Sequence, residues 1–172
     1  ASASIADGVE IGPYSIIGAN VTIEQGTKIE SHVVIKGPTT IGVNNHFFQF
    51  SSIGEDPQDL KYRGEPTELH IGNHNTFRES CTVNRGTVGG GGVTVIGDHN
   101  LIMAYVHIAH DCIINNHVIL VNNASLAGHV TVHDHAILGG FTLVSQFITI
   151  GSYAFSTMGS AINKNIPPYI LV

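Results

Sequence analysis

The sequence predicts an all-β fold, a parallel β-helix, and three observations predict it. Large aliphatic residues recur every six positions, a small or β-branched residue often follows four positions later, and glycine or another small or polar residue often comes next in the chain. A helix requires spacings of three and four, and a half-buried strand alternates without interruption. The pattern therefore indicates very short strands joined by turns, with three repeat units closing each triangular coil.

The period can be followed through most of the chain. The first series is Ile5, Ile11, Ile17, Ile23, Ile29, Ile35, Ile41, Phe47 and Ile53. The same phase returns at Ile71, Phe77 and Val83. After a slip by one position it runs Ile96, Ile102, Ile108, Ile114, Leu120, Leu126, Val132, Leu138, Val144, Ile150, Ser156 and Ile162. Roughly nine coils at ~4.8 Å each predict a triangular prism about 45 Å tall.

Two interruptions break the phase. Between Ile53 and Ile71 the inward positions hold Asp59 and Glu65, which a dry core does not accept unpaired. We therefore expect residues 1–172 to form one domain with an excursion loop near 55–66 and a glycine-rich loop near 88–93. A rigid solenoid that carries one long polar loop usually uses it for function.

Composition excludes several classes of protein. Apolar residues are 42% and charged residues 12% of the chain, which excludes disorder. The net charge of −6 argues against nucleic acid as a partner, and no apolar run approaches the ~20 residues of a membrane span. No signal peptide is visible, and two cysteines are too few for a disulfide framework, so we expect a cytoplasmic protein. Cys81 and Cys112 both fall in small inward positions and are expected to be buried thiols.

Winding into coils of three repeat units brings polar residues to one corner. His110 lies one coil from Gly128 and two coils from Gln146, and Asp111 lies one coil from His129. Strands on successive coils are about 4.8 Å apart, so we expect these side chains to share one edge of the prism.

These residue types are the parts of an acyl-transfer site without a covalent nucleophile. A histidine can take a proton from an alcohol at neutral pH, and a neighbouring carboxylate orients the imidazole. A glycine N–H can stabilise a developing oxyanion. No serine or cysteine beside His110 is an evident nucleophile, which favours direct attack of the acceptor hydroxyl on a thioester. A purely structural polar corner is the alternative.

Two further columns follow from the same spacing. The first is predicted to be a solvated corner ladder, with a metal site between coils as the alternative, and comprises His99, His117, His135 and Tyr153. The second points outward and is apolar, which indicates packing between copies of the chain or a groove for an acyl chain. It comprises Leu101, Ile119, Ile137 and Phe155.

Several motifs together resemble one family, the bacterial acyl-carrier-protein–UDP-N-acetylglucosamine O-acyltransferases. They are His107–Asp111 (HIAHD), Asn122–Val130, the loop from Gly54 to Glu65, Arg78–Ser80, Arg85–Thr87 and Pro167–Tyr169. The resemblance implies a left-handed parallel β-helix and a homotrimer with sites between subunits. It also implies transfer of an (R)-3-hydroxyacyl group from acyl carrier protein to the 3-hydroxyl of UDP-N-acetylglucosamine, the first step of lipid A synthesis.

The resemblance also assigns roles to individual residues. His110 would be the general base, Asp111 would support it, and the Gly128 N–H would stabilise the oxyanion. The remaining assignments are Asp59 and Lys61 to the sugar nucleotide, His107, His129 and Gln146 to the substrate pocket, and Met158 to an acyl-length gauge. No metal or other cofactor is implied.

The chain departs from the family at Ser145 and Asn84, where members usually carry histidine. The family's C-terminal helical domain, which supplies uridine-binding and carrier-protein-binding residues, is absent from these residues. The alternatives are the sister N-acyltransferase, another hexapeptide acyltransferase, a zinc carbonic anhydrase on the same prism, and a non-catalytic solenoid.

Overall fold

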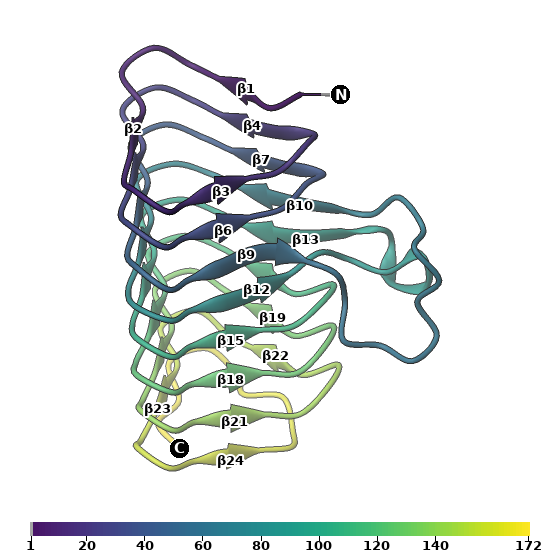
Figure 1. Ribbon diagram of the computed structural model, residues 1–172. Helices are drawn as coiled ribbons and strands as arrows, with labels where there is room; N and C mark the ends of the chain where they lie inside the picture. Colours follow the sequence, from purple (N-terminus) through teal and green to yellow (C-terminus); the bar gives the residue numbers. More distant parts are fainter. Residues whose placement is uncertain (1) are drawn as a thin grey trace.

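A computed structural model describes residues 2–172 as a three-sided prism built from short parallel strands (Figure 1). Each side is an eight-stranded sheet in which every third strand of the chain is a neighbour. As the chain descends in Figure 1, the near strands run to the right and the far strands to the left, which is a left-handed turn. The predicted left-handed parallel β-helix is confirmed.

The three sheets are named here A, B and C. Sheet A contains β1 (Ser4–Ile5), β4 (Val21–Ile23), β7 (Thr39–Ile41), β10 (Glu68–Ile71), β13 (Val93–Ile96), β16 (Ile113–Ile114), β19 (Thr131–Val132) and β22 (Thr149–Ile150). Sheet B contains β2 (Glu10–Ile11), β5 (Lys28–Ile29), β8 (His46–Phe47), β11 (Thr76–Phe77), β14 (Leu101–Ile102), β17 (Ile119–Leu120), β20 (Ile137–Leu138) and β23 (Phe155–Ser156). Sheet C contains β3 (Ile16–Ile17), β6 (Val34–Ile35), β9 (Ser52–Glu55), β12 (Thr82–Asn84), β15 (His107–Ile108), β18 (Ser125–Leu126), β21 (Leu143–Val144) and β24 (Ala161–Ile162).

The predicted period sets the pairing register. In β17 and β20, Leu120 pairs with Leu138, which lies one coil later in the chain, and both are fully buried. Burying an aliphatic side chain of this size stabilises the fold by about 1.5–3 kcal/mol. Because this column of buried residues continues through the prism, the core is one cluster rather than a set of separate patches.

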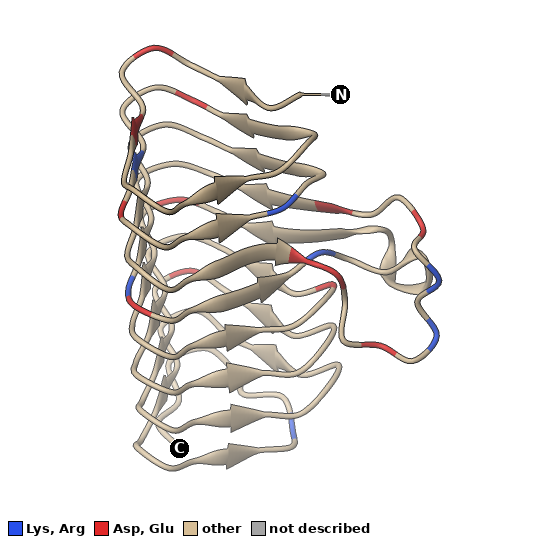
Figure 2. Cartoon of the chain, viewed as in Figure 1, with Lys and Arg blue, Asp and Glu red and all other residues tan. Residues whose placement is uncertain are grey.

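The two interruptions leave the prism without disturbing this register. Ile41 pairs with Ile71 across the first interruption, and Ile71 pairs with Ile96 across the second. The first interruption joins β9 to β10, and the second joins β12 to β13 and contains the short 3-10 helix η1 (Val88–Gly90). Both loops project from the same edge of the prism and lie together, as Figure 1 shows. Figure 2 shows charged residues gathered on these loops and sparse on the coils below them.

The corners of the prism require backbone with positive φ. Asp111 and His129, one coil apart, both adopt it, with φ of 60° and 64°. Asn and Asp tolerate this conformation better than most residues, and here the stacked coils hold histidine in it as well. The shared conformation makes the side chains of successive corners project in the same direction.

An unpredicted polar ladder lies inside the core. Asn45, Asn75 and Asn100 are almost fully buried and follow one another on successive coils. The Asn75 Oδ1 accepts from the Asn100 N–H at 2.9 Å, and the Asn100 Oδ1 accepts from the Val118 N–H at 2.7 Å. Buried amides are stable only when they are bonded in this way. The inward positions that usually hold a small residue therefore also hold asparagines, whose side-chain oxygens accept hydrogen bonds from backbone N–H groups of the next coil.

The buried cysteines and the two outer columns that the repeat predicts are present in the structure. Cys81 and Cys112 are fully buried, and burial raises the pKa of each thiol to about 12. The histidine column is exposed and stacked, and it is longer than predicted: His74, His99, His117, His135, Tyr153 and Tyr169. The apolar stripe of Leu101, Ile119, Ile137 and Phe155 occupies the outer side of sheet B. Among residues 2–172 no helix has both the length and the apolar character needed to cross a membrane.

Candidate active site

The centre of the site is a hydrogen-bonded pair at the corner that follows β15. The His110 Nδ1 lies 2.7 Å from the Asp111 Oδ2, and both residues are buried. A carboxylate has only acceptor atoms, so the imidazole donates its Nδ1–H in this bond. In the neutral ring the Nε2 then carries the free lone pair, which is the atom a general base uses.

The Asp111 carboxylate is held by the glycine-rich loop. The backbone N–H of Thr87 donates to Oδ1 at 2.8 Å, and the Thr87 hydroxyl donates to Oδ2 at 2.6 Å. The Asp111 N–H in turn donates to the Thr94 hydroxyl at 2.8 Å. Gly90 lies directly against the carboxylate, and any side chain there would collide with it. The loop thus fixes and covers Asp111, a role that the sequence did not reveal.

Gly128 lies against the imidazole one coil on, as the register predicted. A Cβ at Gly128 would stand 2.5 Å from the His110 Cε1 and 2.8 Å from its Nε2, so only glycine fits. Within residues 2–172 the Gly128 N–H makes no hydrogen bond to protein, which leaves it available to a ligand. His110 and Gly128 both line one cleft, so a ligand bound there can meet the imidazole and the free backbone donor.

His129 completes the corner. Its Nε2 lies 3.8 Å from the Asp111 Oδ2, and its ring is edge-on to the His110 ring at 5.2 Å between centroids. The prediction that Asp111 and His129 meet on adjacent coils is confirmed. Phe147 stacks on the other side of His129 at 4.4 Å and limits the movement of that imidazole.

Two clefts flank the pair. One, of about 370 Å³, contains His107, His110, Gly128 and Gln146 among its lining residues. The other, of about 430 Å³, lies under the excursion loop and contains Asp59, Lys61, Thr87 and His129. Of the nine residues assigned from the sequence, the structure thus brings all but Asp111, which is covered, and Met158 to the walls of these two clefts.

His107 faces the first cleft from the outer side of β15. Its Nδ1 lies 2.7 Å from the Thr82 hydroxyl. Burial, with a smaller contribution from the nearby His110, lowers the pKa of His107. Its imidazole therefore stays neutral at neutral pH and serves as a hydrogen-bonding group rather than a fixed charge.

Met158 is placed apart from the other predicted residues. It follows β23 and lies at the corner between sheets B and C, whereas His110 lies at the corner between sheets C and A. The side chain is 78% exposed and approaches Gly140. Within one chain, a ligand that reaches both residues must cross the outer side of sheet C.

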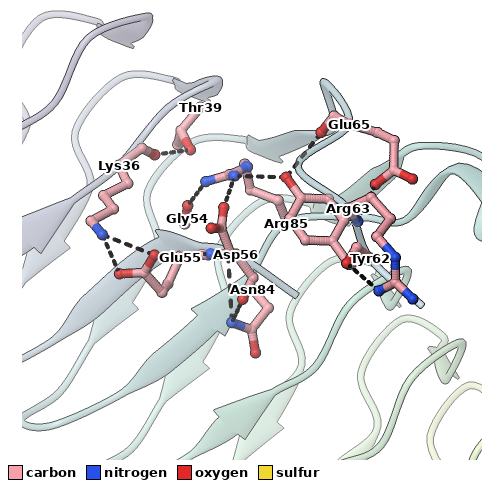
Figure 3. Close-up of polar contacts among 10 residues, drawn as sticks. All are labelled: Lys36, Thr39, Gly54, Glu55, Asp56, Tyr62, Arg63, Glu65, Asn84 and Arg85. Atoms are coloured by element: carbon pink, nitrogen blue, oxygen red, sulfur yellow. Dashed lines mark hydrogen bonds and ion pairs between the residues drawn. The ribbon is translucent and has the colours of Figure 1, made fainter. Parts of the chain in front are cut away.

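Asp59 and Lys61 sit on a turn of the excursion loop. The Asp59 Oδ1 accepts from the Lys61 N–H at 2.9 Å, and the Asp59 carbonyl accepts from the Tyr62 N–H at 3.0 Å. The loop is tied to the prism by Arg85, whose contacts Figure 3 shows. This tie was also missed from the sequence.

His110, Asp111 and His129 are the residues that offer close-set metal-ligand atoms in the described part of the chain. Ligand atoms about 2.0–2.1 Å from a tetrahedral zinc stand roughly 3.3 Å from one another. The His110 and Asp111 atoms are 2.7 Å apart, which is the distance of a hydrogen bond. The geometry is that of a proton-accepting pair.

Comparison with known proteins finds hexapeptide-repeat transferases. The family "Bacterial transferase hexapeptide (six repeats)" matches residues 93–128. Acyl-[acyl-carrier-protein]–UDP-N-acetylglucosamine O-acyltransferases of Stutzerimonas stutzeri and Saccharophagus degradans are 61% and 60% identical over 99% of this chain. The chain spans 66% of the length of each, somewhat under two thirds.

Solved structures give the same result. LpxA from Acinetobacter baumannii superimposes with a TM-score of 0.98 at 54% identity, covering 99% of this chain and 66% of that one. The UDP-N-acetylglucosamine acyltransferase of Campylobacter jejuni superimposes with a TM-score of 0.77 at 40% identity, covering 99% and 69%.

The three-sided prism and the hexapeptide-repeat match are those of a hexapeptide-repeat transferase. Within that class, the sequence identities of 40–61% over 99% of this chain are all to UDP-N-acetylglucosamine acyltransferases. The chain belongs to the UDP-N-acetylglucosamine O-acyltransferase family.

The hold of Thr87 on Asp111 generates a testable prediction. Thr87→Val removes a hydrogen bond to a charged group, of a kind worth about 1.5–3 kcal/mol, so we expect kcat for acyl transfer to fall about ten- to a hundred-fold with KM nearly unchanged. Thr87→Ser keeps the hydroxyl and should retain most of the turnover. Steady-state kinetics on the two variants measure this, and equal kcat in Thr87→Val and the parent would contradict the positioning role.

Proposed function

We propose that this protein transfers an (R)-3-hydroxyacyl group from acyl carrier protein to the 3-hydroxyl of UDP-N-acetylglucosamine, the first step of lipid A biosynthesis. The observation that carries the proposal is the convergence of the free His110 Nε2 and the free Gly128 N–H at one corner. The relatives that are 61% and 60% identical to this chain are named for the same acceptor and donor. A cytoplasmic location is part of the proposal.

His110 acts as general base on the acceptor hydroxyl. As the hydroxyl oxygen attacks the thioester carbonyl, its proton passes to the His110 Nε2, and the imidazolium is stabilised by Asp111. The tetrahedral intermediate carries a negative oxygen, and the free Gly128 N–H is the donor assigned to it. Collapse expels the carrier-protein thiolate, which takes the proton back from the imidazolium.

A direct transfer fits the side chains around the base better than a covalent intermediate. The two cysteines are fully buried with pKa values near 12, so neither supplies a thiolate nucleophile. Both substrates must then be bound at once, which agrees with the presence of two clefts on either side of the pair.

The sugar nucleotide is assigned to the cleft under the excursion loop. Lys61 is exposed there and offers a cation to a phosphate or hydroxyl oxygen, and Asp59 offers an acceptor for a sugar hydroxyl. His107, His129 and Gln146 complete the pocket. Asn84 supports the loop: its amide donates to the Asp56 carbonyl at 2.8 Å.

The acyl chain is assigned to the outer side of sheet C. Ser125, Leu143 and Ala161 pair in register along this face and lead from the coil of His110 toward the coil of Met158. Three coil spacings make this distance about 14 Å. We place the end of the acyl chain at Met158, which serves as the length gauge. Homotrimer formation would supply a second wall for this groove, and the apolar stripe on sheet B provides surface for such packing.

Substitution of the base tests the proposed function. His110→Ala should lower O-acyl transfer by a factor of about 10²–10⁴, the usual contribution of a general base. The matched control is His117→Ala, an exposed histidine of the stacked column, which should keep full activity. Mass spectrometry of the product formed from UDP-N-acetylglucosamine and hydroxyacyl carrier proteins measures the rate. Full activity in His110→Ala with an unchanged assembly would refute the mechanism.

The gauge makes a separate prediction about specificity. Met158→Gly removes a bulky exposed side chain from the end of the proposed groove, so longer acyl chains should be accepted. Competition among carrier proteins loaded with chains of different length measures the preference. An unchanged preference among acyl-chain lengths would contradict the role of Met158 as the length gauge.

A further inference from the structure

We propose that Arg85 is a positioning residue that holds the excursion loop in the shape that presents Asp59 and Lys61 to the sugar nucleotide. The inference rests on the proposed function and extends it to a residue with no assigned role. Arg85 is only 6% exposed, and a buried arginine is uncommon unless its guanidinium is paired.

The guanidinium of Arg85 makes all its side-chain contacts with the loop or with the residues that lead into it. Its Nη1 donates to the Gly54 carbonyl, and its Nη2 forms an ion pair with the Asp56 carboxylate. The same Nη2 lies 3.3 Å from the Tyr62 hydroxyl (Figure 3). One planar group thus joins the start of the loop to its middle.

Tyr62 carries this restraint to the turn that bears the substrate residues. Its hydroxyl donates to the Glu65 carbonyl at 2.9 Å, and its N–H donates to the Asp59 carbonyl. Tyr62 is also the residue directly after Lys61. A change in the position of Tyr62 therefore moves both candidate sugar-nucleotide contacts together.

Apart from Arg85, only two side chains of the prism bond to the described chain between β9 and β10, those of Asn84 and Glu55, and both do so at its first residue. Between β9 and β10 the described chain forms no strand or helix, and Leu60 is 96% exposed. The remaining bonds of the tip are within the loop, such as the Arg63 guanidinium to the Leu60 carbonyl at 2.6 Å. A segment with so few contacts to the prism opens readily unless an anchor such as Arg85 holds it.

The place of Arg85 in the chain separates its role from that of Thr87. The Arg85 N–H donates to the Glu55 carbonyl at 3.0 Å, and two positions later Thr87 holds Asp111. One short segment therefore supports the sugar-nucleotide loop with one residue and the catalytic pair with another. Loss of Arg85 should raise KM for the sugar nucleotide, whereas loss of Thr87 should lower kcat.

Arg85→Lys is the test, because lysine keeps the charge and cannot make the forked contact. In the purified protein, trypsin cleavage after Lys61 or Arg63 should become about ten-fold faster, because the loop opens more often. KM for UDP-N-acetylglucosamine should rise about ten-fold, with kcat and the KM for acyl carrier protein within about two-fold of the parent.

Two further variants keep the test decisive. Arg78→Lys makes the same chemical change on an exposed arginine that pairs with Glu79 at the corner between sheets B and C, away from the loop, and should leave both measurements at the parent values. Asp56→Asn alters the exposed partner of the ion pair and should also speed cleavage and raise KM. It therefore tests the anchor even if Arg85→Lys fails to fold.

The outcomes separate this inference from the function it rests on. Parent-like cleavage and KM in both Arg85→Lys and Asp56→Asn would overturn the anchor. Faster cleavage with an unchanged KM would overturn the link between the anchor and the sugar nucleotide. The rate of trypsin cleavage does not depend on enzyme activity. It therefore tests the anchoring role of Arg85 even if the parent protein fails to acylate UDP-N-acetylglucosamine.

Discussion

The pairing of each strand with the strand one coil later is the constraint on which the rest of the structure depends. Parallel pairing at about 4.8 Å turns a separation of one full coil in the sequence into direct contact. At the corner after β15, this register places Gly128 against the His110 ring and His129 near the Asp111 carboxylate. The buried aliphatic columns that stabilise the prism thus also set the geometry of the site.

The two loops add what a regular repeat cannot supply. A corner on one coil offers few groups that can surround a buried carboxylate from outside. The glycine-rich loop provides the Thr87 donors and covers Asp111, and the excursion loop provides a second cleft wall with Asp59 and Lys61. Since both insertions leave the same edge and the core register continues past them, the prism gains a site without losing its core.

How far the sequence predicted this structure depends on the period. Contacts between residues one regular coil apart were predictable, including His110 with Gly128, and so were the buried positions of both cysteines. Thr87 with Asp111 was not, because these residues are separated by the glycine-rich insertion and follow no repeat. His74 was missed in the stacked column for the same reason, since that insertion also lies between it and His99. The left hand came from family resemblance, because general topology favours right-handed crossovers.

The central claim is that Asp111 accepts a hydrogen bond from the Nδ1–H of His110, which leaves Nε2 free to act as the base. The tautomer of His110 tests this claim most directly. Nitrogen-15 NMR of the imidazole, assigned by comparison with His110→Ala, distinguishes a protonated from a bare ring nitrogen. The account predicts a protonated Nδ1 and a bare Nε2 in the neutral ring. A neutral ring protonated on Nε2 would contradict it, because no lone pair would then face the Gly128 N–H and the incoming hydroxyl.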